Sequence, residues 1–167
     1  MDENFNKYVR MLRSVLDVNK NIIFFCIGTD RVIGDCLGPI TGTLLKEKYD
    51  KNIIFGDLDE NVTYENIEEK LNEINSKFNN PYIIAIDAAL STKENVGKIF
   101  LDNNGIDFGN CLGKNIGCVG NVGIKVVIGK DYDDPNLNFK ILQNVSLSEV
   151  IKLSRKTFEG ISLILNK

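Results

Sequence analysis

The 167-residue chain contains no histidine and no tryptophan, and only three prolines. The missing histidine excludes Ser-His-Asp and Cys-His hydrolases, zinc sites with imidazole ligands and imidazole general bases. Acid–base chemistry in this chain must therefore depend on aspartate, glutamate, lysine, tyrosine or cysteine.

Neither sign of charge dominates, because 20 Lys and Arg stand against 23 Asp and Glu, for a net charge of -3. This balance gives no reason to expect a nucleic-acid partner. No apolar run approaches the roughly 18 residues of a membrane span, and the polar start of the chain, Met1 to Asn4, resembles no secretion signal. We therefore expect a cytoplasmic protein with no membrane partner, whose ligand is a peptide or another small molecule.

The four cysteines are Cys26, Cys36, Cys111 and Cys118, and they form neither a C-x-x-C pair nor a short regular spacing. Cys26 lies inside an apolar run, where a small apolar side chain is expected. This pattern favours reduced thiols over a disulfide framework. Cys36 is also a poor candidate nucleophile, because the chain offers no histidine to act as its base.

Short apolar runs alternate with amphipathic segments through the first half of the chain. Apolar residues spaced by three and four predict helices at 5–16, 37–49 and 63–78, the last capped by Thr63. Runs rich in β-branched and aromatic residues predict buried strands at 22–27, 52–55 and 82–86. Strands that alternate with helices over short connections are typical of right-handed crossovers and a largely parallel sheet.

The second half of the chain is less regular. Further strands are predicted at 97–101 and 122–128, around an excursion rich in Asn and Gly at 102–120. A last helix at 146–165 starts with Ser146 and Glu149 in the spacing of a capping box.

No linker, repeat or low-complexity segment divides the sequence, and its length suits one domain. We therefore expect a single α/β domain over residues 1–167, with an N-terminal helix at 1–18 and a core at 21–165. The predicted architecture is a three-layer α/β/α sandwich around a mostly parallel sheet.

Two aspartates occupy positions where an open parallel sheet binds its ligands, beyond the carboxyl ends of the strands. Asp35 lies in the loop after the first predicted strand, and Asp87 directly follows the third. Two facing carboxyl groups can share a proton, so that one polarises a carbonyl group while the other activates water. The pair therefore suggests amide hydrolysis without histidine, metal or a covalent nucleophile.

Simpler roles fit the same segments. Asp35 and Asp30 would also serve as caps of the following helix, and an aspartate after a strand often binds only loop N–H groups. The glycine spacing at Gly34 and Gly38 matches no nucleotide-binding motif and favours a turn and a close helix approach. The acidic run at 131–134 predicts a solvated turn, because it lacks the spacing of an EF-hand calcium loop.

Several segments together resemble the YyaC family of sporulation proteins. They are, in chain order, Cys-Ile-Gly-Thr-Asp-Arg at 26–31, Gly-Asp-Cys-Leu-Gly-Pro at 34–39, Ile-Asp-Ala-Ala-Leu at 86–90, Val-Gly-Asn-Val-Gly at 119–123 and Leu-Gln-Asn-Val-Ser-Leu at 142–147. The resemblance extends from Asn21 to the last helix. That family is similar to the germination protease that degrades small acid-soluble spore proteins, and more remotely to the hydrogenase maturation endopeptidases.

The resemblance implies a phosphorylase/hydrolase-like α/β/α sandwich and an aspartate-dependent endopeptidase. The proposed catalytic aspartates of the germination protease match Asp35 and Asp87. Thr29 and Asp30 would shape the loop, and Asn121 would donate a hydrogen bond to the substrate carbonyl. The histidine that senses nickel in the hydrogenase enzymes has no counterpart here, so we expect no metal and no other cofactor.

The chain departs from the family pattern at two positions. Cys36 stands where Ala or Ser is expected, and Ala89 separates Ala88 from Leu90. The chain is also much shorter than the germination protease and shows no evident propeptide.

The leading hypothesis is a sporulation-associated endopeptidase of the cytoplasm, in the sporulating cell or forespore, that acts on a protein or peptide substrate. One alternative is a catalytically inactive module that binds a peptide or a spore-assembly partner in the same cleft. A self-associating structural protein, forming a homo-oligomer, is a third reading of the sequence, and large exposed apolar patches would be its sign.

Overall fold

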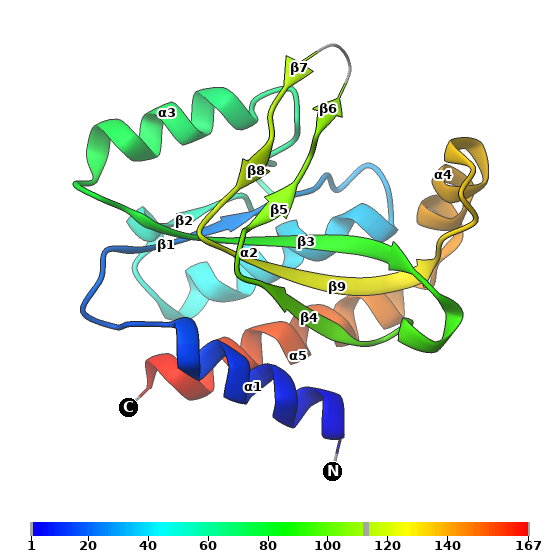
Figure 1. The fold of residues 1–167 in the computed structure, drawn as a ribbon, viewed down its shortest axis with the longest axis horizontal. Coiled ribbons are helices and arrows are strands. Elements are labelled where there is room, and N and C mark those ends of the chain that lie inside the picture. The colour runs from blue at the N-terminus through cyan, green and yellow to red at the C-terminus, as the bar shows by residue number, and fades with distance from the viewer. Residues whose placement is uncertain (1, 112–113, 167) are drawn as a thin grey trace.

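A five-stranded sheet lies at the centre of the computed structural model, which describes residues 2–111 and 114–166 (Figure 1). The strands follow the order β2-β1-β3-β9-β4. They are β1 (Ile22–Cys26), β2 (Ile54–Phe55), β3 (Tyr82–Ser91), β4 (Ile99–Asp102) and β9 (Val122–Lys130). All neighbours are parallel except β4, which runs antiparallel to β9. The predicted, mostly parallel sheet is confirmed.

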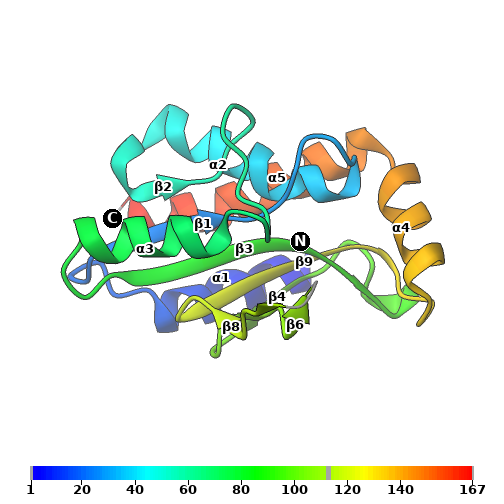
Figure 2. The ribbon, with the colours of Figure 1, turned by 90° about the horizontal axis from the view of Figure 1, so that it is seen from above.

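Helices cover both faces of this sheet. On one face lie α1 (Glu3–Val15), α2 (Leu37–Lys48) and α5 (Leu147–Leu165), and on the other lies α3 (Ile67–Lys77) (Figures 1 and 2). Beside α3 stands an arm made of four short strands: β5 (Ile106–Asp107), β6 (Asn110–Cys111), β7 (Lys114–Asn115) and β8 (Cys118–Val119). The predicted three-layer α/β/α sandwich is therefore confirmed.

The strand β1 shows why these residues form the middle layer. All five of its side chains are buried. Phe24 and Cys26 belong to the apolar cluster under α1, α2 and α5, whereas Ile23 and Phe25 belong to the cluster under α3. A strand covered on both faces needs a continuous apolar run, which is the pattern that predicted it.

The third helix begins later than its apolar spacing predicts. The helix α3 starts at Ile67, and its N-cap Asn66 makes no capping bond with its side chain. Instead, Asn66 Oδ1 accepts a hydrogen bond from Thr63 N at 2.9 Å, and Asn66 Nδ2 donates to Asn61 O at 3.0 Å. These bonds hold residues 63–66 in a turn. The predicted start at 63 and the cap at Thr63 were wrong.

Strand β3 continues to Ser91, so Asp87 lies within it and does not follow its end. The extension pairs with β9, and the register shifts after Ala89 because Ile128 is an extra residue on the β9 side. A bulge of this kind bends the strand locally. The expectation that Asp87 closes the strand is therefore corrected.

Near the end of the chain one helix was not predicted, and the next has the predicted N-cap residue, Ser146, without its predicted capping bonds. The helix α4 (Pro135–Asn144) was not predicted, and Asp134 caps it by accepting from Asn136 N at 2.8 Å. The helix α5 begins after Ser146 without a side-chain capping bond. Glu149 instead binds Lys152 at 2.8 Å, so the predicted capping box is absent at this helix start. Three single-turn helices, η1 (Gly34–Cys36), η2 (Lys51–Ile53) and η3 (Lys93–Asn95), complete the described elements.

Candidate active site

Close backbone packing positions Asp35. After β1 the chain forms a loop and then η1, which leads directly into α2. A Cβ atom added to Gly28 would lie 2.0 Å from Asp35 O, and one added to Gly38 would lie 2.0 Å from Ile27 O. Only glycine allows this approach, which sets η1 against the end of β1. The close helix approach predicted for Gly38 is what the structure shows.

The Asp35 side chain is not used as a helix cap. The N-cap residues of η1 and α2 are Ile33 and Cys36, and neither helix receives a side-chain capping bond. The Asp35 backbone is nevertheless held, because Thr29 N donates to Asp35 O at 3.2 Å. The carboxyl group therefore remains available to the cavity beside it.

Strand alternation directs Asp87 to the same cavity. Ile84 and Ile86 belong to the cluster under α1, α2 and α5, whereas Ile83 and Ala85 belong to the cluster under α3. Side chains alternate along a strand, so Asp87 points to the α3 side of the sheet. The register of β1 with β3 ends at Ile86, one residue before Asp87, whereas β9 pairs with β3 beyond that point, so the Asp87 carboxyl group lies at the carboxyl end of β1.

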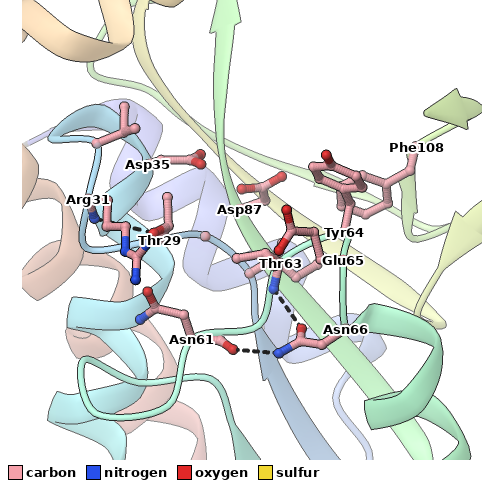
Figure 3. A pocket seen from close by; sticks show the side chains of 13 residues that line it. Thr29, Arg31, Asp35, Asn61, Thr63, Tyr64, Glu65, Asn66, Asp87 and Phe108 are labelled. Atoms are coloured by element: carbon pink, nitrogen blue, oxygen red, sulfur yellow. Dashed lines mark hydrogen bonds between the residues drawn. The ribbon is translucent and has the colours of Figure 1, made fainter. Parts of the chain in front are cut away.

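Asp35 and Asp87 line one cavity of about 580 Å³, and their carboxyl groups point toward each other across it (Figure 3). The cavity opens beyond the carboxyl end of β1, as expected for a parallel sheet. Its remaining lining comes from the loop after β1, from the segment before α3 and from the arm: Ile27, Gly28, Thr29, Arg31, Val32, Asn61, Thr63, Tyr64, Glu65, Asn66 and Phe108.

Burial shifts the titration of both carboxyl groups in the same direction. Desolvation raises the pKa of Asp35. Desolvation also raises the pKa of Asp87 well above its usual range, the negative charge of Asp35 raises it further, and the N–H of Ala88 acts weakly in the opposite direction. Asp87 therefore takes up its proton before Asp35 does, and over a range of pH the pair holds one proton.

The neighbouring thiol is not activated. Burial raises the pKa of Cys36, and the charges of Asp30 and Asp35 raise it further. Cys36 therefore stays protonated and is a weak nucleophile. The described side chains of Cys26, Cys36 and Cys118 are all free thiols, while the side chain of Cys111 lies outside what the structure describes.

The supporting residues predicted from the sequence have different positions. Thr29 lines the cavity, and its Oγ1 accepts a hydrogen bond from Arg31 N at 3.2 Å. Asp30 is exposed and does not line the cavity, although its backbone N–H donates to Asn61 Oδ1 at 3.0 Å and so ties the two loops together.

Asn121 lies away from the carboxyl pair. It directly precedes β9, at the amino end of that strand, and its Oδ1 accepts from Ile83 N at 2.8 Å while its own N–H donates to Ile83 O at 2.7 Å. The side chain thus fixes the start of β9 against β3. The structure does not bring Asn121 to the cavity, so the position of Asn121 does not support the hydrogen bond predicted from it to a substrate carbonyl.

The segment 57–66 forms a wall of the cavity that sequence reasoning missed. Asp57 is buried and paired with Lys46, and its Oδ1 accepts from Asp59 N at 2.9 Å and Glu60 N at 2.7 Å. Asn61 Nδ2 donates to Asp57 O at 2.8 Å. The segment follows the carboxyl end of β2, so the rule that selected Asp35 was a signal that could have found it.

Among the described residues, the structure contains neither a metal-binding cluster of side chains nor a helix that could span a membrane. In residues 2–111 and 114–166, no three His, Cys, Asp or Glu side chains are grouped as a metal ion requires. Among the helices in that part of the chain, each is too short or too polar to cross a bilayer.

Comparison with solved structures shows the same fold in a [NiFe] hydrogenase maturation protease, HycI from Thermococcus kodakarensis KOD1. The TM-score is 0.62, with 15% identity, over 94% of this chain and 99% of that chain. At this identity the likeness is one of fold.

Comparison with known sequences extends the match to the first helix. The "Uncharacterized protein YyaC" of Bacillus subtilis (strain 168) is 32% identical over 145 residues, which cover 86% of this chain and 69% of that protein. The family model described as "Protein of unknown function (DUF1256)" matches residues 1–160. The chain therefore belongs to this family, the family of YyaC.

Proposed function

We propose that this protein is a peptidase in which Asp35 and Asp87 act together on the scissile peptide bond. The observation that carries the proposal is the meeting of two carboxyl groups, from different elements, across one cavity (Figure 3). The raised pKa of each group supports it, because a pair that holds a single proton has both an acid and a base. A solved structure of the same fold is that of a [NiFe] hydrogenase maturation protease, which adds support.

The different environments assign the two roles. Asp87, whose pKa is raised the more strongly, donates its proton in a hydrogen bond to the carbonyl oxygen of the scissile bond. Asp35, as the carboxylate, accepts a proton from the water whose oxygen attacks the carbonyl carbon. When the C–N bond breaks, Asp35 returns that proton to the leaving amine, and the carboxyl pair regains its starting state.

The cavity lining favours a polypeptide as the substrate. Tyr64 and Phe108 provide aromatic surface, and Thr29, Arg31 and Asn61 provide hydrogen-bonding groups. This mixture of apolar surface with a few polar groups is typical of a site that binds both side chains and backbone. Because its motifs resemble those of the YyaC family of sporulation proteins, we propose that the protein acts in the cytoplasm of the sporulating cell or forespore.

The test is incubation of the purified protein with small acid-soluble spore proteins and with a mixed peptide library, read by mass spectrometry. Asp35→Asn and Asp87→Asn should each lower kcat/KM by about 10²–10⁴-fold, the usual contribution of an acid–base group. Asp59→Asn is the matched control, because Asp59 is exposed and does not line the cavity. Retained cleavage in both site variants would refute the assignment.

A wild-type protein that cleaves nothing, while both variants remain folded, would count against the peptidase proposal. Peptides retained by the wild type and lost with Asp35→Asn would then support the inactive binding module instead. The two functions are therefore separated by the same set of purified proteins.

A further inference from the structure

Lys125 is the register neighbour of Asp87 in the sheet. Strands β3 and β9 are parallel and pair Asp87 with Lys125. Paired residues of adjacent strands point to the same face, so both side chains leave the sheet on the α3 side. Adjacent strands are about 4.8 Å apart, and a lysine side chain is longer than that distance. The Lys125 ammonium group is therefore within reach of the Asp87 carboxyl group.

Lys125 instead binds a carboxylate on the opposite side. Its Nζ donates to Asp102 Oδ2 at 2.9 Å. Asp102 lies on the edge strand β4, where its register partner is Gly123, two residues before Lys125 and on the same face of the sheet. Lys125 thus stands between two acidic side chains, Asp87 from β3 and Asp102 from β4.

The orientation of Asp102 is fixed by a second bond. Its Oδ1 accepts from Asn104 N at 2.9 Å, in the turn that leads into the arm. One carboxylate oxygen therefore holds the turn and the other holds the ammonium group. The Asn104 N–H and the Lys125 ammonium lower the pKa of Asp102. Lys125 thus has an ionised partner on the β4 side and the more easily protonated Asp87 on the other.

Few other charged groups face Asp87. Asp35 faces it from η1, and the remaining groups come from the cavity walls. Those that titrate or carry charge are Arg31, Tyr64 and Glu65. The arm contributes the uncharged Phe108 to the cavity.

We propose that Asp102 holds the Lys125 ammonium group on the β4 side of β9 and so keeps it away from the Asp87 carboxyl group. The inference rests on the proposed function, because it makes Lys125 and Asp102 a positioning pair for the acid of that site. A released Lys125 would pair with the ionised form of Asp87 and favour loss of its proton. The site would then lack a proton donor for the substrate carbonyl.

The test is the titration of Asp87 itself, followed by NMR of its carboxyl carbon in the whole protein. Asp102→Asn removes the charge but keeps an oxygen acceptor for the Asn104 N–H, and it should lower the pKa of Asp87 by about 1–3 units. Lys125→Met should cause no such fall. The double variant should return Asp87 to the wild-type titration, because the fall requires the free ammonium group.

Two results would overturn the proposal: an unchanged Asp87 titration in Asp102→Asn, or the same fall in the double variant. Asp102→Ser gives a second uncharged variant if Asp102→Asn does not fold. Glu149→Gln, which breaks the exposed pair between Glu149 and Lys152 on α5, is the matched control and should leave Asp87 unchanged.

The alkaline limb of the kcat/KM profile provides a second readout. In Asp102→Asn it should move to lower pH by the same shift that NMR records. Should the wild type cleave no peptide, the proposed function fails while the NMR titration still decides the positioning role. A fall in activity without any movement of the pH profile would indicate a merely structural pair and would also count against the proposal.

Discussion

The two walls of the cavity are held by different kinds of interaction. The wall after β1, which carries Asp35, packs backbone against backbone at Gly28 and Gly38. The wall at 57–66 is held by polar side chains, beginning with the pair between Lys46 and Asp57. Steric packing does not depend on pH or salt, whereas ion pairs depend on both. Asp35, one of the two proposed catalytic groups, therefore lies on the wall whose geometry should not change with pH or salt.

Gly38→Ala tests the packed wall and should have the largest effect. Alanine favours a helix over glycine by about 1 kcal/mol, and Gly38 lies in α2. The new Cβ would nevertheless lie 2.0 Å from Ile27 O, a backbone atom that cannot move aside as a side chain would. We expect the free energy of unfolding to fall by about 3 kcal/mol, measured by urea titration.

Gly97→Ala is the control for this substitution. A Cβ at Gly97 meets nothing within 4 Å, although its φ of +86° strains any other residue. Its cost should be limited to about 1–2 kcal/mol of backbone strain. Equal losses in the two variants would show that close packing does not hold this wall.

Lys46→Met tests the polar wall, with an expected loss of about 2 kcal/mol at neutral pH. Burial alone would raise the pKa of Asp57, but the Lys46 ammonium and two backbone N–H groups outweigh it and lower that pKa. A lowered pKa in the folded state gives stability above the unfolded pKa, and this stability is lost as the pH falls through the folded pKa.

The difference between Lys46→Met and wild type should therefore narrow as acid is added, while the loss in Gly38→Ala stays constant. Urea titrations across the acidic range measure both. Lys51→Met is the control, because Lys51 is exposed and pairs with no acidic side chain among the described residues. A pH-independent loss in Lys46→Met would remove the distinction between the walls.

Asp87→Asn, in the strand β3, sharpens the comparison because it should raise the free energy of unfolding, whereas the substitutions in the two walls lower it. The raised pKa means that the folded protein binds the proton more tightly than the unfolded chain. The wild type therefore loses stability as the pH rises through the interval between the unfolded and folded pKa values of Asp87. Asparagine carries no charge, so the variant should be more stable than wild type at neutral pH, by about 1.4 kcal/mol for each unit of the shift.

This advantage should disappear below the ordinary pKa range of a carboxyl group, where both states of the wild type are protonated. Thermal unfolding at several pH values measures it. An Asp87→Asn variant that is less stable than wild type at neutral pH would contradict the raised pKa.

The sequence indicated the carboxyl pair because its signals are local. Apolar runs that end at polar residues identified the region of Asp35 and Asp87, and the glycines around Asp35 indicated a close approach. Both signals depend only on neighbouring residues and on how parallel sheets place the ends of their strands.

The remaining parts of the site depend on contacts between distant segments. Phe108 reaches the cavity from an arm whose short strands have no clear period. The hydrogen bonds of the Asn66 side chain hold residues 63–66 in a turn, so α3 begins later than its apolar spacing predicts. The helix α4 lies wholly in the described part of the chain, and none of its residues is fully buried. Its apolar spacing therefore did not predict a helix.

The strand beneath Asp87 also limits how a protein could present its cleavage site. Because β3 continues past Asp87 and stays paired with β9, the sheet closes one side of the cavity, and a scissile bond must enter from the α3 side of the sheet. A peptide bond inside a folded helix or sheet of the substrate cannot fit between the two walls of the cavity. We therefore expect the proposed peptidase to cleave only extended, flexible segments, so the folding state of a target would decide whether it is cut.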